Sequence, residues 1–359
     1  MVTADRILER DYRMPGDRRA WASVLGRPGS VRPGHTAFDL KRAADAAQQR
    51  IAAYIRRTPL LRSDWLSQVG GCNAFLKLEN LQHTGSFKVR GAFNSLLSLK
   101  QGNGRGQVVT GSSGNHGIAV AYAAAKLGLR ATVFVPETVS SAKALAIERY
   151  GAEIRSGGAE SGEAEQKARD YADAEKIPYI SPYNDPLVVA GQSTVGAEIL
   201  DQLPSVSTLL APVGGGGLIT GMAAFLKARL HPLQVIGCQP ANSPAMAEAV
   251  IAGRAVETTI LPTLSDGTAG LLEPGTITVR LCQDLVDSFA LVSESSIRDA
   301  LRGFADAEHM VIEGAAAVPI AALLESHGAY RDQDVVVVVS GANIGPRELA
   351  TALAGTGTA

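Results

Sequence analysis

The sequence has few cysteines, and no two of them lie close together. Among its 359 residues only Cys72, Cys238 and Cys282 carry a thiol, and no CxxC pair is present. Disulfide scaffolds and zinc knuckles need paired or closely spaced cysteines, so this spacing argues against both. Unpaired thiols suit a reducing compartment, and we therefore expect a cytoplasmic protein.

An excess of charge of one sign is also lacking. The chain has 34 basic and 35 acidic residues, a formal net charge of −1 and no long run of one sign. Partnership with nucleic acid or an anionic membrane usually goes with a basic excess. No apolar run is long enough to span a membrane, and the charged N-terminus lacks the apolar centre of a secretory signal. We expect a soluble protein that binds neither nucleic acid nor membrane.

Short apolar runs alternate with helical patterns along most of the chain. Residues 1–36 are rich in Arg, Gly and Pro, lack this rhythm, and are interpreted as an extension. Several later runs are continuously apolar, as in parallel strands covered on both faces, which predicts an α/β fold with one or two open sheets. The predicted strands are Ala74–Leu78, Gln107–Thr110, Ala131–Pro136, Thr208–Pro212, Gln234–Cys238, Phe289–Val292 and Val335–Val339. The predicted helices are Phe38–Ile55, His116–Leu127, Ala142–Tyr150, Glu163–Glu175, Gly217–Leu230 and Ile297–Glu308.

Ligands of such sheets bind beyond the carboxyl ends of the strands, and one loop in that position offers an anion site. "TGSSGNHG" (residues 110–117) joins a predicted strand to an Ala-rich helix. It provides hydroxyls, an amide and free backbone N–H groups at a helix N-terminus. Ordinary helix capping by Ser112, Ser113 or Asn115 is the alternative interpretation.

A second loop contains four consecutive glycines, in "PVGGGGLITG" (residues 212–221). Each glycine costs backbone entropy, so the run favours N–H groups that wrap a phosphate over a purely structural turn. No Gly-Lys-Ser/Thr follows, and Ile219 stands where a dinucleotide fingerprint needs its third glycine. The pattern therefore indicates a phosphate site of another kind.

Two further segments carry chemistry. In "VVVVVSGANIG" (residues 335–345), Ser340 is either a turn residue or a neutral hydrogen-bond partner for the ring nitrogen of a ligand. "TGSFKVRGAF" (residues 84–93) holds Lys88 and Arg90 among small and apolar residues, and a solvated helix start is the simpler interpretation. A lysine, a phosphate loop, an anion loop and a strand-tip hydroxyl together suit pyridoxal 5′-phosphate (PLP).

These motifs resemble those of the fold-type II PLP enzymes, in their serine/threonine dehydratase and serine racemase branch. The matching stretches are "LKLENLQHTGSFKVRGA", "SSGNHG", "YNDPLVVAGQSTVGAE", "APVGGGGLITG", "PTLSDGTAG", "EGAAAV" and "SGANIG". The resemblance implies a tryptophan synthase β-like fold of two open, twisted, mostly parallel sheets flanked by helices. It places the cofactor between a large domain (residues 37–104 and 188–359) and a small domain (residues 105–187), in a homodimer.

The resemblance also implies roles for single residues. Lys88 would hold PLP as a Schiff base and, once freed, remove the α-proton of the substrate, with Ser113 as a second acid/base. Arg90 would be structural, and Ser340 would face the ring nitrogen. The other cofactor-binding residues would be Phe87, Asn115, Gly214, Gly215, Gly216, Gly217 and Leu218, and the substrate carboxylate would be held by Ser112, Ser113, Gly114, Asn115 and His116.

Racemase-like relatives bind a divalent cation through an acidic residue and further ligands at positions that are neutral in this sequence. Those positions hold Gln239, Ser243 and Ala245. Because hard cations prefer charged oxygen ligands, we expect no divalent metal.

The activity implied is that of a dehydratase (ammonia-lyase), which eliminates water from a β-hydroxy-α-amino acid to give a 2-oxo acid and ammonia. L-Threonine and L-serine are the expected substrates, with phenylserine and 3-hydroxyaspartate as alternatives. An amino-acid racemase, and a PLP-binding protein without turnover, are the competing functions. The intact Lys88, Asn115 and Ser340 argue against the last of these.

Overall fold

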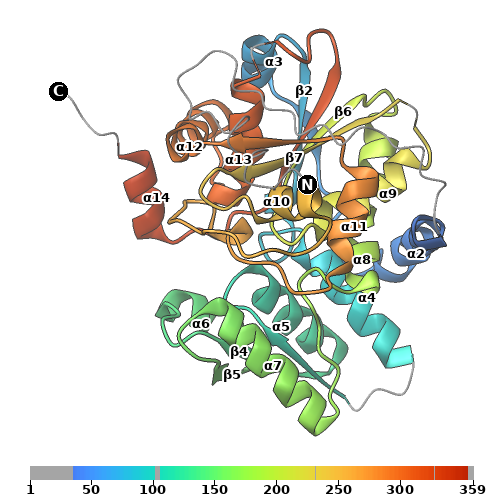
Figure 1. Ribbon diagram of the computed structural model, residues 1–359, viewed down its shortest axis with the longest axis vertical. Coiled ribbons are helices and arrows are strands. Elements are labelled where there is room, and N and C mark those ends of the chain that lie inside the picture. Colours follow the sequence, from blue (N-terminus) through green and yellow to red (C-terminus); the bar gives the residue numbers. More distant parts are fainter. Residues whose placement is uncertain (1–34, 102–105, 231, 327, 355–359) are drawn as a thin grey trace, which may run out of the picture.

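The chain forms two separate β-sheets flanked by helices (Figure 1). A computed structural model describes residues 35–101, 106–230, 232–326 and 328–354. The large sheet has the order β1 (Leu60–Arg62), β2 (Asn73–Leu78), β9 (Asp334–Val339), β6 (Thr208–Pro212), β7 (Gln234–Pro240) and β8 (Ser288–Val292), and only its β1–β2 pair is antiparallel. The small sheet is parallel and consists of β3 (Gln107–Gly111), β4 (Arg130–Val135) and β5 (Glu153–Ser156).

Helices connect these strands and cover their faces. Three belong to the small sheet: α5 (Asn115–Leu127), α6 (Ser141–Glu148) and α7 (Ser161–Glu175). We call residues 107–175 the small-sheet region. The other helices are α2 (His35–Ile51), α3 (Asp64–Gly70), η1 (Glu79–Leu81), α4 (Lys88–Gln101), α8 (Pro186–Gln202), α9 (Gly217–Lys227), α10 (Ala245–Ala252), η2 (Asp266–Thr268), α11 (Ile277–Leu285), α12 (Glu294–Glu308), α13 (Gly314–Leu324) and α14 (Pro346–Leu353).

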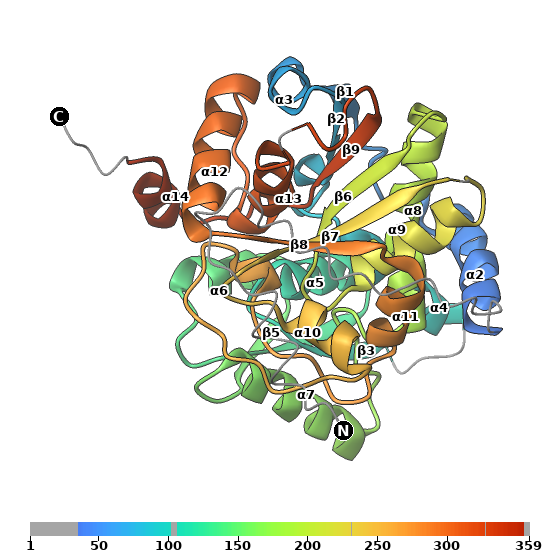
Figure 2. The same cartoon turned by 45° about the horizontal axis from the view of Figure 1, so that its top comes forward.

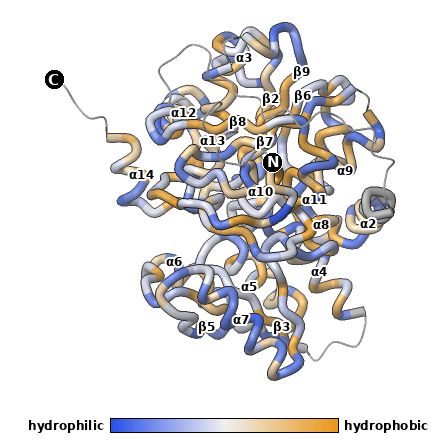
Figure 3. Tube along the Cα trace, in the orientation of Figure 1, coloured by the Kyte–Doolittle hydropathy of each residue, from blue (hydrophilic) through white to orange (hydrophobic). Residues whose placement is uncertain are grey.

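The central strand β9 explains why the large sheet needs helices on both sides. Its five consecutive valines are all buried. Val336 and Val338 point into the core that contains α8 and α9, while Val335, Val337 and Val339 point into the core that contains α12 and α13. Successive side chains of a strand face opposite ways, so a strand without polar positions is stable only when covered twice. Figure 2 shows these helix pairs on opposite faces of the sheet, and Figure 3 shows the strands between them as hydrophobic.

Helix α4 joins the two parts of the molecule. It packs against α8 beside the large sheet and against α5 beside the small one. Asp185 caps the start of α8 by accepting the N–H of Leu187 at 2.7 Å, and Pro186 occupies the first turn, where its missing N–H has no cost. The first residue of α4 is Lys88, so the lysine lies where the two parts meet.

The α/β fold with two sheets is confirmed, and every predicted strand lies within two residues of an observed one. The short strand β1 and the half-exposed strand β5 were not predicted, because neither has an apolar run. Helix α2 begins at His35, three residues before the predicted Phe38, and residues 1–34 of the predicted extension lie outside the described residues. Helix α2 ends at Ile51 and not at the predicted Ile55, because Tyr54 leaves the helix and stacks on Phe93 at 5.0 Å. The proposed domain limits remain a prediction.

Candidate active site

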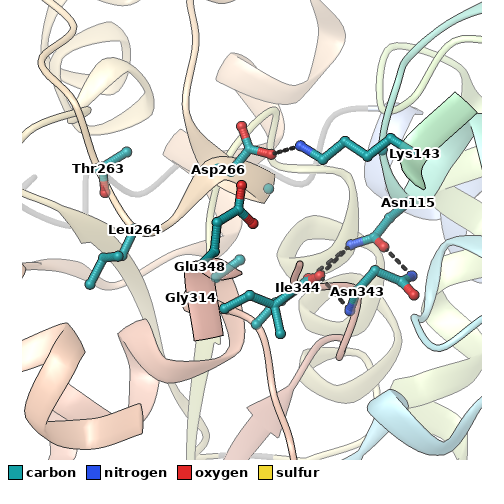
Figure 4. A pocket seen from close by; sticks show the side chains of 13 residues that line it. Asn115, Lys143, Thr263, Leu264, Asp266, Gly314, Asn343, Ile344 and Glu348 are labelled. Carbon is teal, nitrogen blue, oxygen red and sulfur yellow. Dashed lines mark hydrogen bonds and ion pairs between the residues drawn. The ribbon is translucent and has the colours of Figure 1, made fainter. Parts of the chain in front are cut away.

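The loops that leave the carboxyl ends of β3 and β9 meet at Asn115 and Asn343. A cavity of about 270 Å³ lies there (Figure 4). The small-sheet region contributes Gly114, Asn115 and Lys143 to its lining, and the large-sheet side contributes Asp266, Glu313, Asn343 and Glu348, among others. An ion pair of 2.7 Å between Lys143 and Asp266 spans the cavity.

Lys88 lies at the start of α4 with its amine held in a partly buried pocket. Its Nζ donates to the carbonyl of Pro182 at 3.0 Å and lies 5.3 Å from the centre of the Phe87 ring. Burial lowers the pKa of the amine to about 8, against the opposing charges of Glu165 and Glu313. A lysine with such a pKa is partly unprotonated near neutral pH and can act as a nucleophile or base.

Arg90 has a structural environment, as predicted. Its guanidinium is fully buried and forms 2.7 Å ion pairs with Glu79 and Glu198. Burial opposes its charge, but the two carboxylates hold its pKa above the usual value. Lys77 completes this group at 2.7 Å from Glu198, so two cations and two anions balance one another under the site.

The glycine loop after β6 leaves no room for side chains. A Cβ on Gly215 would lie 2.2 Å from the ring of Tyr183, and one on Gly214 would lie 3.0 Å from the Cα of Thr268. Gly216 caps α9 with φ +82° and no side-chain hydrogen bond. The first N–H groups of α9 therefore face the loop without a capping side chain, which makes an anion site.

The loop after β3 is a second helix start without a side-chain cap. Gly114 is the N-cap of α5, and no side chain caps the helix there, so the capping interpretation of Ser112, Ser113 and Asn115 is wrong. The ring of His116 is buried, and its Nε2 pairs with the carbonyl of Ile180 at 3.0 Å. Burial lowers the pKa of His116 to about 3, so the ring stays neutral. The backbone N–H of His116 can therefore donate to an anion, whereas its neutral ring cannot supply a positive charge.

Asn115 is held by two residues to which the sequence prediction gave no role. Its Nδ2 donates to both carboxylate oxygens of Glu313, at 2.8 and 2.9 Å, and its Oδ1 accepts from Asn343 at 2.5 Å. Burial raises the pKa of Glu313, although the amide of Asn115 and the backbone N–H of Asn343 oppose this. Glu313 directly precedes the Ala-rich α13, in the matching stretch "EGAAAV". The acid in this stretch was the one feature of the sequence that could have pointed to its role.

Ser340 follows the last residue of β9 and is buried. Its hydroxyl has no hydrogen-bond partner among the described residues, and the same holds for the hydroxyls of Thr84 and Ser86. The Ser340 carbonyl accepts the N–H of Phe87 at 3.1 Å, so this strand tip is tied to the lysine segment. Buried hydroxyls are normally paired, so the unpaired hydroxyl of Ser340 is available to a ligand.

Residues 51–341 match the family of pyridoxal-phosphate dependent enzymes. The chain belongs to this family. It is 39% identical over 304 residues to a catabolic L-threonine dehydratase of Staphylococcus aureus, covering 84% of this chain and 88% of the relative. Threonine deaminase isoform 2 from Solanum lycopersicum superposes with a TM-score of 0.86 at 30% identity, covering 93% and 92% of the two chains. A serine racemase from maize superposes with a TM-score of 0.81 at 30% identity, covering 87% and 96%.

The residues of this PLP-dependent enzyme fit the cofactor. The glycine loop and the N-terminus of α9 form a phosphate cradle in which a Cβ on Gly215 or Gly216 would clash. The free hydroxyl of Ser340 suits a ring nitrogen, and the amine of Lys88 has the lowered pKa that a Schiff base requires. Fold type II and PLP dependence, both predicted from the sequence, are thus confirmed.

Proposed function

We propose that the protein is an ammonia-lyase that removes water from a small β-hydroxy-α-amino acid, L-threonine or L-serine, to give a 2-oxo acid and ammonia. The observation that carries this proposal is the neutral, buried and unpaired hydroxyl of Ser340 at the tip of β9. A hydroxyl does not keep the ring nitrogen of the cofactor charged, and this favours loss of a β-group over transamination. The similarity to the threonine dehydratase and deaminase supports the same reaction.

When bound, PLP withdraws electrons from the α-carbon of the substrate, so that the α-proton becomes removable. The residues of this chain bind the substrate and move its α-proton. Lys88 would hold the cofactor covalently, and its free Nζ would take the α-proton of the substrate. Its pKa of about 8 leaves a useful fraction of free amine for that step. The N–H groups at the start of α5, with Ser112 and Ser113, bind the substrate carboxylate.

Asn115 and Glu313 position the cofactor in this proposal. The carboxylate of Glu313 accepts from Asn115 Nδ2, and the N–H of Asn343 donates to it at 3.2 Å. This arrangement fixes the rotamer of Asn115, the residue that we assign to the phenolic oxygen of PLP. Phe87, Leu218 and Gly217 complete the cofactor contacts that we assign.

The decisive experiment is a substrate panel scored for 2-oxo acid, with chiral analysis of the amino acid that remains. Formation of 2-oxobutanoate from L-threonine supports the proposal, and D-amino acid without 2-oxo acid contradicts it. Racemisation is the second candidate, because the chain superposes on a serine racemase and Ser113 lies in the anion loop. Lys88→Ala should abolish turnover and borohydride fixation of PLP, whereas Lys167→Ala, on the exposed side of α7, should change neither.

We further propose that turnover needs no divalent cation. The side chain of Gln239 accepts the N–H of Ala247 at 2.8 Å and donates to the carbonyl of Ser243 at 3.4 Å, so it holds the start of α10. A neutral amide used in this way is a poor ligand for Mg²⁺ or Ca²⁺. Treatment with a chelator should leave the rate of 2-oxo acid release unchanged, and a large loss restored by Mg²⁺ would contradict the proposal.

A homodimer in the cytoplasm is also proposed. No helix among the described residues is long and apolar enough to cross a membrane. The three thiols are buried and unpaired, which suits a reducing compartment. Exposed Leu261 and Leu271 offer apolar surface for a subunit contact. Light scattering of the holoenzyme at low concentration measures the subunit number, and a monomer would contradict the dimer.

A further inference from the structure

Helix α7 brings an acidic side chain to the edge of the site. A Cβ on Gly111 would lie 2.6 Å from the Cα of Glu165, so α7 rests directly on the carboxyl end of β3. Gly111 is followed by Ser112 and Ser113, the loop to which we assign the substrate carboxylate. Glu165 therefore lies beside the substrate loop, although no sequence motif includes it.

The carboxylate of Glu165 is only weakly paired, because Arg169, its nearest cation, is shared with a second acid. Arg169 lies 4.0 Å away, beyond hydrogen-bond distance, and its guanidinium is engaged by Glu273 at 2.6 Å. Burial has the largest effect on the pKa of Lys88 and lowers it, and the charge of Glu165 comes next and raises it. Burial raises the pKa of Glu165 to about 7, while Arg169 and Lys88 lower it and Glu273 raises it further.

Two tyrosines complete this wall of the site. The ring of Tyr183 touches the glycine loop at Gly215, and its hydroxyl accepts the N–H of Glu273 at 2.8 Å. The ring of Tyr179 lies 4.4 Å from the guanidinium carbon of Arg169, and its buried hydroxyl has no partner among the described residues. We call Glu165, Tyr179 and Tyr183 the α7 wall. This wall offers a carboxylate and hydroxyls, and the neighbouring cation, Arg169, is already paired with Glu273.

We propose that Glu165 determines which β-substituent the enzyme accepts, by repelling amino acids that carry a second carboxylate on the β-carbon. The inference rests on the proposed function and selects among its substrates: it admits L-threonine and L-serine and excludes 3-hydroxyaspartate. Two carboxylates that approach in a partly desolvated site repel each other much more strongly than in water. A hydrogen or methyl group on the β-carbon has no such cost.

The test compares kcat/KM for L-threonine with kcat/KM for L-threo-3-hydroxyaspartate in four forms of the holoenzyme: wild type, Glu165→Gln, Glu165→Asp and Glu175→Gln. The last is the matched control, since Glu175 is an exposed residue at the end of the same helix. Glu165→Gln should reduce the preference for L-threonine about tenfold, mainly by a gain on the dicarboxylate. Glu165→Asp should keep the preference, and Glu175→Gln should leave it unchanged.

The pH dependence gives a sharper version of the same comparison. As pH rises through about 7, Glu165 ionises, so the preference of the wild type for L-threonine should increase between pH 6 and 8. The preference of Glu165→Gln should stay flat over this range. A slope that survives in Glu165→Gln would assign the discrimination to another group and overturn the proposal.

A second readout does not depend on turnover. In the apoenzyme, the pKa of Lys88 can be measured by pH-dependent acetylation followed by peptide mass spectrometry. Removing the charge of Glu165 should lower this pKa, because the carboxylate favours the protonated amine. An unchanged pKa in Glu165→Gln would overturn the placement of Glu165 towards the amine.

The two proposals fail in different ways. If the wild type gives no 2-oxo acid from any substrate of the panel, the proposed function is wrong and the substrate choice falls with it. If it gives 2-oxobutanoate from L-threonine while Glu165→Gln keeps the full preference, only the role of Glu165 is wrong.

Discussion

Lys88 and Arg90 are two residues apart on α4 and have opposite surroundings. The amine of Lys88 contacts a backbone carbonyl and an aromatic ring, which leave it free to react. The guanidinium of Arg90 is enclosed by Glu79 and Glu198. The resemblance to fold-type II PLP enzymes assigned a reactive role to Lys88 and a structural role to Arg90. The local sequence could not reveal the partners of Arg90, because Glu198 lies 108 residues further along the chain.

Removal of the Arg90 charge should therefore lower the free energy of unfolding. Arg90→Met leaves two buried carboxylates with only Lys77 as a cation, and breaking a buried ion pair in this way costs about 3–5 kcal/mol of unfolding free energy. Denaturant titration of the apoenzyme measures this, with Lys88→Met on the same helix as the control. An equal loss in both variants would show that Arg90 is no more structural than Lys88.

Ser340 should set the type of reaction. In Ser340→Asp a carboxylate would keep a proton on the ring nitrogen and make the cofactor a stronger electron sink. The variant should release 2-oxo acid more slowly and give more transamination and racemisation per turnover, while the neutral Ser340→Ala should keep the elimination product. If the ratio of products is unchanged in Ser340→Asp at full cofactor occupancy, Ser340 is only a turn residue.

At the scale of helices and strands, the sequence predicted best where one local pattern dominates. The valine run of β9 and the glycine run before α9 are of this kind, and both lie where expected. Local sequence patterns could not show contacts between segments that are distant in the chain. Glu313 reaches Asn115 across 198 residues, and Glu165 sits on an ordinary polar helix whose sequence gives no reason to single it out.

The glycine loop allows a direct test of its close packing. Gly215→Ala would place a methyl group 2.2 Å from the ring of Tyr183, so either the loop or the tyrosine must move. We expect a clear loss of PLP affinity, measured by reconstitution of the apoenzyme, with little change in secondary structure. Gly162→Ala is the control: it lies in α7 with open space around it and should bind PLP normally. Full affinity in Gly215→Ala would show that the loop is not a tight cradle.

At the scale of the whole molecule, ion pairs join the small-sheet region to the loops of the large sheet. Lys143 on α6 pairs with Asp266, and Arg169 on α7 pairs with Glu273. Both acids lie between α10 and α11, Asp266 in η2 and Glu273 in the loop that follows it. The cavity at the site is thus bounded by two parts of the fold that meet through side chains and not through a shared sheet.

Reversal of the Lys143 charge should weaken the contact between the small-sheet region and the loops of the large sheet. Lys143→Glu places two anions face to face across the cavity, and we expect a higher KM for L-threonine with a smaller change in kcat. The double variant Lys143→Glu with Asp266→Lys restores opposite charges and should recover most of the affinity. If the double variant is no better than the single one, the pair does not hold the two parts together.

The strand order of the large sheet also determines when a newly made chain can first become active. β9 lies in the middle of that sheet, between β2 and β6, yet it is the last strand in the sequence. The ribosome adds about 5–20 residues per second, so the segment carrying Lys88 waits roughly ten seconds or longer for Ser340 to be made. During that time the edges of β2 and β6 that pair with β9 in the finished sheet have no partner. The site to which we assign PLP is therefore complete only when synthesis is almost finished.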